Sequence, residues 1–199
     1  MRVLLGFALL AASCRPLAPP PAIDPRLASR IPEDASAIAG FNPAAFRNLT
    51  TAFAEERYVL IALEGTEVLT ITAGSMPPAP ARHRVSPLLA EAERLAEHSP
   101  AWAVIRGGTV LPLPGNLVNL NQFLRNATLV RLSAQGGNPP RVELTATCPN
   151  LQSATQFENS LRAVLVLTKL GSPAELRRDG QTVHASLTPA PEALTKLLH

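Results

Sequence analysis

Short stretches of alternating apolar and polar residues recur along this chain, separated by stretches with the 3.6-residue periodicity of helices. In its first part the predicted elements are a strand at 35–41, a helix at 42–56, a hairpin at 58–74, a helix at 86–98 and a strand at 101–108. Asn42 followed by Pro43 is typical of a helix start, and Gly65 can supply the positive φ of a turn. This order predicts a ferredoxin-like βαββαβ unit.

The second part of the chain repeats the pattern, and the strand at 101–108 could serve both parts. The predicted elements here are a helix at 116–127, strands at 128–135 and 141–148, a helix at 149–170, a hairpin at 174–187 and a helix at 188–199. Asp179-Gly180 is a strong signal for a short hairpin turn. We therefore predict a second ferredoxin-like unit.

The predicted fold class is α+β, with two fused ferredoxin-like units built on antiparallel sheets whose helices pack on one face. The predicted boundaries are a signal peptide at 1–13, a lipidated cysteine and Pro-rich tether at 14–30, and two units at 31–106 and 107–199. A single continuous domain over 31–199 is the alternative division. Either division leaves enough chain to bury a core.

The first fourteen residues have the layout of a secretory signal peptide. Arg2 supplies a positive charge, the next ten residues are apolar or Gly, and small residues precede Cys14. The apolar run is about half the ~20 residues that a membrane-spanning helix needs, so we do not expect it to remain as a transmembrane segment. Five prolines between Arg15 and Arg26 favour an extended segment after it.

The stretch LAASC, which ends at Cys14, resembles the lipobox of bacterial lipoproteins. The resemblance implies that Cys14 is acylated and becomes the first residue of the mature chain. It also implies an exported protein that is anchored by lipid to a membrane and faces the periplasm. Because Arg15 rather than Asp follows the cysteine, it implies the outer rather than the inner membrane. Cleavage without lipidation is the alternative, and the protein would then be secreted.

Composition excludes some classes of function. Two lysines, Lys169 and Lys196, stand among 18 basic residues, the net charge is +3 and aromatic residues make up 4%. The arginines are scattered apart from Arg177-Arg178 and the pair Arg82/Arg84, so we predict no nucleic-acid partner. If Cys14 is acylated or removed, Cys148 has no partner within the chain, and its place on an alternating strand predicts a small buried apolar residue.

The sequence contains no recognised catalytic or cofactor-binding motif. The four histidines lack the spacing of a zinc site, and neither a nucleophile elbow nor a phosphate-binding loop is present. Neighbouring carboxylates, such as Glu55-Glu56, are expected on solvated surfaces. We therefore predict no cofactor, no metal site and no catalytic residue.

One constellation has the character of a binding surface. Alternation places a set of polar side chains on the side of the second sheet opposite its apolar positions: Arg131, Ser133, Arg141, Glu143, Thr145, Thr147, Thr182, His184 and Ser186. A merely solvated sheet face is one interpretation. The other is a docking surface for a protein or glycan, with Arg131, Arg141 and His184 as anchors.

The resulting hypothesis is a non-enzymatic lipoprotein of the cell envelope that acts as an interaction or accessory module. Its expected partners are a membrane, through the N-terminal lipid, and an envelope protein or glycan. The stretch IPEDASAIAGFNPAAFR also resembles the start of uncharacterised bacterial envelope proteins, which implies no particular activity. The alternative hypothesis is a periplasmic small-ligand-binding protein or hydrolase with a site between the two units.

Overall fold

The computed structural model describes residues 23–46, 58–72, 86–112, 121–135, 140–168 and 175–189. The helical elements are α1 (Pro25–Ala28), the 3-10 helix η1 (Pro43–Phe46), α2 (Leu89–Ala96), α3 (Asn121–Leu124) and α4 (Leu151–Thr168). The strands are β1 (Ala37–Phe41), β2 (Val59–Glu64), β3 (Glu67–Thr72), β4 (Ala101–Arg106), β5 (Leu129–Gln135), β6 (Arg141–Thr147), β7 (Glu175–Asp179) and β8 (Thr182–Leu187).

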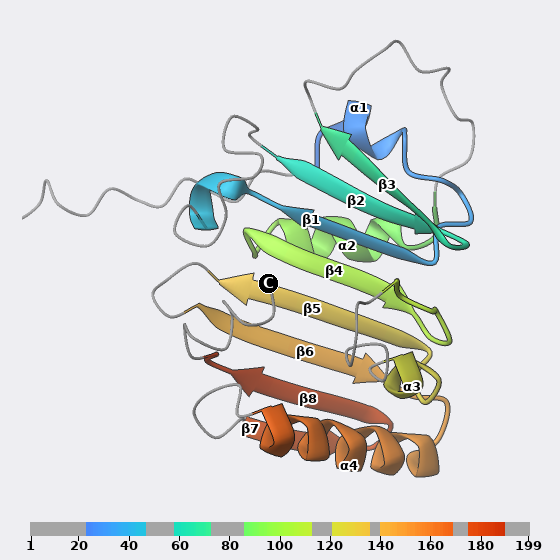
Figure 1. Ribbon diagram of the computed structural model, residues 1–199, viewed down its shortest axis with the longest axis vertical. Helices are drawn as coiled ribbons and strands as arrows, with labels where there is room; N and C mark the ends of the chain where they lie inside the picture. The colour runs from blue at the N-terminus through green and yellow to red at the C-terminus, as the bar shows by residue number, and fades with distance from the viewer. Residues whose placement is uncertain are drawn as a thin grey trace, which may run out of the picture.

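All eight strands belong to one open antiparallel sheet, in the order β3-β2-β1-β4-β5-β6-β8-β7 (Figure 1). The predicted α+β class with an antiparallel sheet is therefore confirmed. We call β3-β2-β1-β4 the first half of the sheet and β5-β6-β8-β7 the second half. The two halves meet where β4 pairs with β5 along six residues, from Ala101↔Ala134 to Arg106↔Leu129.

The prediction of two ferredoxin-like units is not confirmed. In such a unit the first two strands are parallel, with another strand between them, whereas here β1 pairs directly with β2 and runs antiparallel to it. The strand order 3-2-1-4 is that of a Greek key, in which three consecutive strands form a meander and the fourth returns beside the first. The connection after β1 begins with the four-residue helix η1, where the sequence predicted a helix over 42–56.

Two hairpin turns and one long helix that were predicted from short stretches of sequence are confirmed. Gly65 and Gly180 have φ of 61° and 56° and form the turns of the β2–β3 and β7–β8 hairpins, as predicted. The long helix α4 is confirmed, and the side chain of Asn150 accepts a 2.8 Å hydrogen bond from the Ser153 N–H at its start. Asn42 likewise accepts from the Ala44 N–H at 2.9 Å. The predicted helix at 188–199 extends beyond the described residues.

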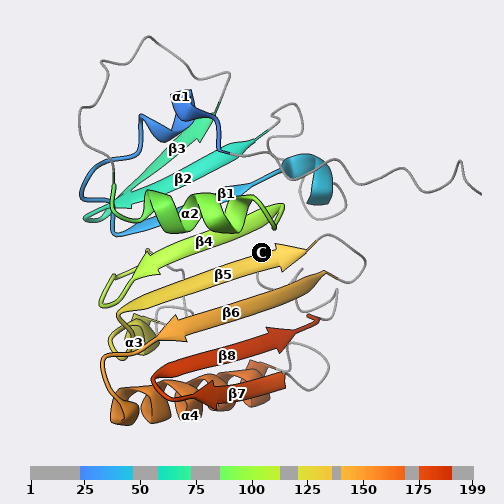
Figure 2. The same ribbon diagram turned by 180° about the vertical axis from the view of Figure 1, so that it is seen from behind.

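The described helices of each half share one face, but the two halves use opposite faces of the single sheet. Helices α1 and α2 cover one face of the first half, and α3 and α4 cover the other face of the second half (Figures 1 and 2). Residues paired across adjacent strands point to the same face, and Val104, under α2, is opposite Arg131. Its neighbour Ile105 points to the other face, opposite Val130.

Each half has its own hydrophobic core. In the first half, Ile38, Leu60 and Val104 are fully buried against α1 and α2. The Trp102 indole N–H donates a 2.7 Å hydrogen bond to the Tyr58 hydroxyl within that core. Burial raises the pKa of Tyr58 to about 12.

The second core forms between α4 and strands β5, β6 and β8. Phe157 of α4 packs there with Val183, which is fully buried, and with Cys148 beside them at 2% exposure. The prediction that Cys148 is a small buried apolar residue is confirmed. Burial raises the pKa of its thiol.

The folded part of the chain includes residues predicted to belong to the tether. Asp24 caps α1 through a 2.8 Å hydrogen bond from the Arg26 N–H, and Ile23 and Leu27 are buried in the first core. The first core therefore includes residues that precede position 31. Cys14 and the signal peptide lie outside the described residues.

Candidate functional site

The second half of the sheet presents a polar face on the side opposite α3 and α4 (Figure 2). Strand register places its side chains in rows that run across the strands. One row, which we call the basic row, is Arg131, Thr145, His184 and Arg177, from β5, β6, β8 and β7 in turn. The next, the acidic row, is Ser133, Glu143, Ser186 and Glu175. The strand register places all nine residues that were predicted for this face on the polar face.

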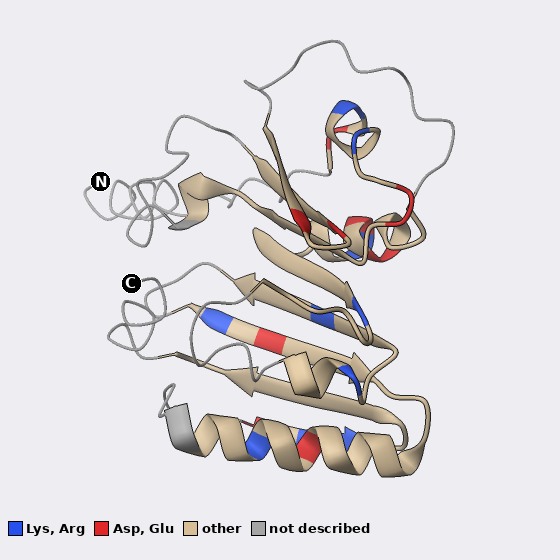
Figure 3. Ribbon diagram, turned by 45° about the vertical axis from the view of Figure 1, so that its right-hand side comes forward, with Lys and Arg blue, Asp and Glu red and all other residues tan. Residues whose placement is uncertain are grey.

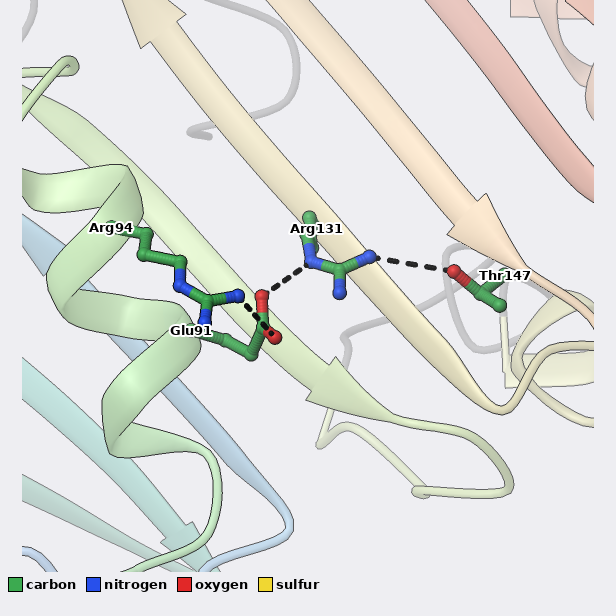
Figure 4. A network of polar contacts seen from close by, with 4 residues as sticks. All are labelled: Glu91, Arg94, Arg131 and Thr147. Atoms are coloured by element: carbon green, nitrogen blue, oxygen red, sulfur yellow. Dashed lines mark hydrogen bonds and ion pairs between the residues drawn. The ribbon is translucent and has the colours of Figure 1, made fainter.

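Arg131 stands at the border of the polar face, where it binds α2. Its Nε–H donates to Glu91 Oε2 at 2.9 Å, and its Nη1 donates to the Thr147 hydroxyl at 3.4 Å (Figure 4). Glu91 also pairs with Arg94 at 3.2 Å. The hydrogen bond from Arg131 lowers the pKa of the Glu91 carboxyl. The charge of Arg131, a predicted anchor, is therefore already compensated within the fold.

The other two predicted anchors lie farther out on the face. Arg141 Nε–H donates to the Ser186 hydroxyl at 3.1 Å and is 3.3 Å from the Glu143 carboxylate, and both charged side chains are more than half exposed. His184 Nδ1 is 3.3 Å from the Thr145 hydroxyl, in the adjacent strand. Arg141 and Glu143 follow one another on β6, where Figure 3 shows one basic and one acidic band.

These side chains line a shallow, open pocket of about 210 Å³. Its charged and hydroxyl groups come from Arg141, Glu143, Thr145, Glu175, Arg177, His184 and Ser186. The structure thus brings Arg141 and His184 together and leaves Arg131 outside. It adds Glu175 and Arg177 of β7, which sequence reasoning missed. The signal was present, because the predicted Asp179-Gly180 turn sets a register that puts Arg177 opposite His184.

Arg177 differs from its neighbour Arg178. Consecutive strand residues face opposite sides, and Arg178 Nε donates to Glu158 of α4 at 3.0 Å. Arg177 is exposed on the polar face, and its side chain makes no ion pair or hydrogen bond with any residue in the described part of the chain. Its guanidinium is available to a ligand.

The face of the first half opposite α1 and α2 carries mainly apolar residues in the described part of the chain. It forms an open groove of about 280 Å³ lined by Ala39, Ile61, Leu63, Val68, Ala103 and Ile105. The sequence did not reveal this groove, because β1, β2 and β4 carry apolar residues toward both faces and alternation alone cannot tell the faces apart.

Two searches of the described residues gave negative results. No group of three or more His, Cys, Asp or Glu side chains in the ranges given above could hold a metal ion. Among the helices that the structure describes, none has the length and apolar character needed to cross a membrane.

Comparison with known proteins found no matching family model, no similar curated protein and no similar solved structure.

Proposed function

We propose that this protein is a lipid-anchored module of a bacterial cell envelope that docks a partner protein on the polar face of its sheet. The main support for the proposal is the pocket lined by Arg177, whose guanidinium has no partner within the described chain. Nearby, Arg141 and His184 add two more basic groups from different strands. A rigid sheet holds all three in fixed relative positions.

The charge pattern of the face favours protein recognition. Basic and acidic rows lie side by side, so a partner must present both signs in the correct register. Electrostatic complementarity of this kind gives specificity and suppresses wrong partners. Helix α2 borders the face at Glu91 and Arg131 and limits the directions from which a partner can approach (Figure 4).

The positions of the shifted pKa values support binding rather than catalysis. Catalytic groups are expected in a cleft, with pKa values displaced by burial and by charged neighbours. Here burial in the two cores shifts the pKa values of Tyr58 and Cys148, and the hydrogen-bonded ion pair with Arg131 shifts the pKa of Glu91. The pocket lies within the second half, whereas the alternative hypothesis, a small-ligand or hydrolase site, requires one between the two units.

The proposal places the anchor at Cys14, on the basis of the lipobox resemblance. Eight residues lie between Cys14 and Ile23, which is the first residue described and is already part of the first core. A chain of that length spans at most about 30 Å. The folded part would then stay close to the membrane surface.

Site-specific photo-crosslinking tests the docking face. A photoreactive residue replaces Thr145, on the polar face, in the full-length protein expressed in its native host. The matched control replaces Ala163, which is exposed on α4. We expect a discrete crosslinked protein from position 145 that is absent from position 163 and is lost on Arg177→Glu. Equal crosslinking at both positions, or a crosslinked glycan in place of a protein, contradicts the proposed docking of a protein.

Palmitate labelling tests the anchor separately. Wild-type protein should carry the label and stay in the membrane fraction, whereas Cys14→Ala should carry none and become soluble. Label that persists in Cys14→Ala, or that is absent from both proteins, contradicts lipidation at Cys14.

A further inference from the structure

The inference concerns what occupies the pocket on the polar face, and it rests on the docking role proposed above. The basic and acidic rows are two residues apart on each strand, because Arg177 follows Glu175 on β7 and Thr145 follows Glu143 on β6. Two residues of an antiparallel strand extend about 6.8 Å. An extended peptide repeats at the same spacing, since its side chains i and i+2 point the same way.

Available donors are concentrated on the basic row. Arg177 has no ion pair within the described chain, and His184 uses Nδ1 toward Thr145, which leaves Nε2 for a ligand. A guanidinium binds a carboxylate through two parallel hydrogen bonds, and an adjacent imidazole can add a third donor. The basic end of the pocket therefore matches one carboxylate.

The acidic row selects against other anions. Glu175 and Glu143 stand beside the basic row, and Glu143 is only partly compensated by Arg141, at 3.3 Å and with both side chains more than half exposed. A phosphate or sulfate dianion in this small pocket would meet these carboxylates as well as the guanidinium. A ligand that carries its own positive group about 7 Å from its carboxylate satisfies both rows.

We propose that the pocket binds an extended segment of a partner protein with the pattern acidic-x-basic. The acidic side chain binds Arg177 and His184, and the basic side chain two positions along binds Glu175 and Glu143. The segment lies along the strands, and because its acidic residue comes first, it runs from the basic row toward the acidic row, parallel to β8. Both groups must be present at the i, i+2 spacing.

Blocked, fluorescently labelled pentapeptides test the proposal against the full-length protein in detergent. The probe is acetyl-Gly-Glu-Ala-Lys-Gly-amide. The controls carry Glu-Ala-Glu or Lys-Ala-Lys, and a spacing control carries Glu-Ala-Ala-Lys, whose charged side chains point to opposite sides when extended. Fluorescence anisotropy should show the Glu-Ala-Lys probe binding at least about tenfold more tightly than each control.

The two adjacent arginines provide matched variants. Arg177→Ala should weaken probe binding about tenfold, whereas Arg178→Ala, on the opposite face, should leave it unchanged. Circular dichroism of both variants checks that the fold is retained. Equal binding of all peptides, competition by millimolar sulfate as strong as that by unlabelled probe, or equal effects of the two variants overturns the proposal.

The outcomes also separate this proposal from the docking role. If the peptides fail but crosslinking at position 145 still depends on Arg177, the face docks a partner with different chemistry and only the acidic-x-basic pattern is wrong. If both experiments fail, the docking role is wrong as well.

Discussion

Each half of the sheet has four antiparallel strands, but the two halves leave opposite faces uncovered by the described helices, and those faces differ in chemistry. The first half has α1 and α2 on one side and an apolar groove on the other. The second half has α3 and α4 on the groove's side of the sheet and a polar, charged face on the other. One continuous sheet therefore offers two unlike surfaces, and only the polar one carries charges arranged in register.

The difference follows from which strands carry apolar residues toward both faces. In β1 and β4, consecutive residues that point to opposite faces are both apolar, as in Ala37-Ile38 and Val104-Ile105. Either face of these strands could therefore be covered by helices. In β6 and β8, alternation is strict, so only one face can be covered. In the second half, the strand sequences thus decide which face is polar, whereas in the first half they do not.

Removing the main contact of α4 should have the largest effect. Phe157→Ala leaves a cavity in the second core, and we expect the free energy of unfolding to fall by about 3–5 kcal/mol. Hydrogen exchange should speed up most in β6 and β8 and least in β1 and β2. Equal acceleration in both halves would mean that the two cores do not differ in local stability.

The corresponding test in the first core is Gly40→Ala. A Cβ at this position would come within 2.5 Å of both the Trp102 ring and the Tyr58 hydroxyl, so the substitution overpacks the core. The expected loss of stability is about 1–3 kcal/mol. Trp102 is the only tryptophan, so its fluorescence should change in Gly40→Ala and not in Phe157→Ala. An unchanged spectrum in Gly40→Ala would contradict the packing described.

Substitution of the turn glycines should lower the free energy of unfolding by similar amounts in the two halves. Gly65 and Gly180 have positive φ, and nothing lies within 4 Å of a Cβ built on either, so only backbone strain opposes a side chain. Gly65→Ala and Gly180→Ala should each lower the unfolding free energy by about 1–2 kcal/mol. Urea unfolding of the single and double variants should give additive losses, and a large excess in the double variant would contradict independent turns.

The ion pair between the halves should have the smallest effect. Glu91 and Arg131 are each about a quarter exposed, so Glu91→Gln should cost about 0.2–1 kcal/mol at pH 7. Because the folded-state pKa of Glu91 is lowered, its contribution is present above the ordinary carboxyl pKa and is lost as the pH falls through the folded value.

Urea unfolding of wild type and Glu91→Gln at several pH values measures this dependence. The difference between the two proteins should shrink as the pH falls below about 4. Arg94→Ala removes the more exposed arginine, whose side chain is 75% exposed, and should leave the Arg131 contact and its pH dependence in place. A difference that grows toward low pH would contradict the assigned pair.

Much of the local structure could be predicted from the sequence. The turn glycines and the helix predicted at 149–170 depend on signals within short stretches of chain, so the pattern identifies them directly. The residues of the polar face were predicted for the same reason, since strict alternation in β6 and β8 assigns each side chain to a face.

Other features depend on contacts between distant parts of the chain. No local pattern in the sequence indicates that β1 pairs directly with β2, rather than lying parallel to it with another strand between them. Nor does any local pattern indicate that α2 and α4 cover opposite faces of the sheet. The Glu91–Arg131 pair joins residues forty positions apart, so Arg131 looked available for a partner in the sequence alone. Arg177 was the reverse case, because it faces away from α4 and from the Glu158 carboxylate that binds Arg178.

The return of β4 beside β1 also has a consequence for the order of folding. Ala37 must meet Ile105, which closes a long loop, whereas β5 meets β6 and β7 meets β8 across short turns. Loop closure disfavours distant pairings until other contacts compensate, and folds rich in such pairings form slowly. We therefore expect the second half to assemble early after refolding begins, with the Trp102 signal developing later. The part of the chain that leaves the ribosome first would then be the last to reach its final packing.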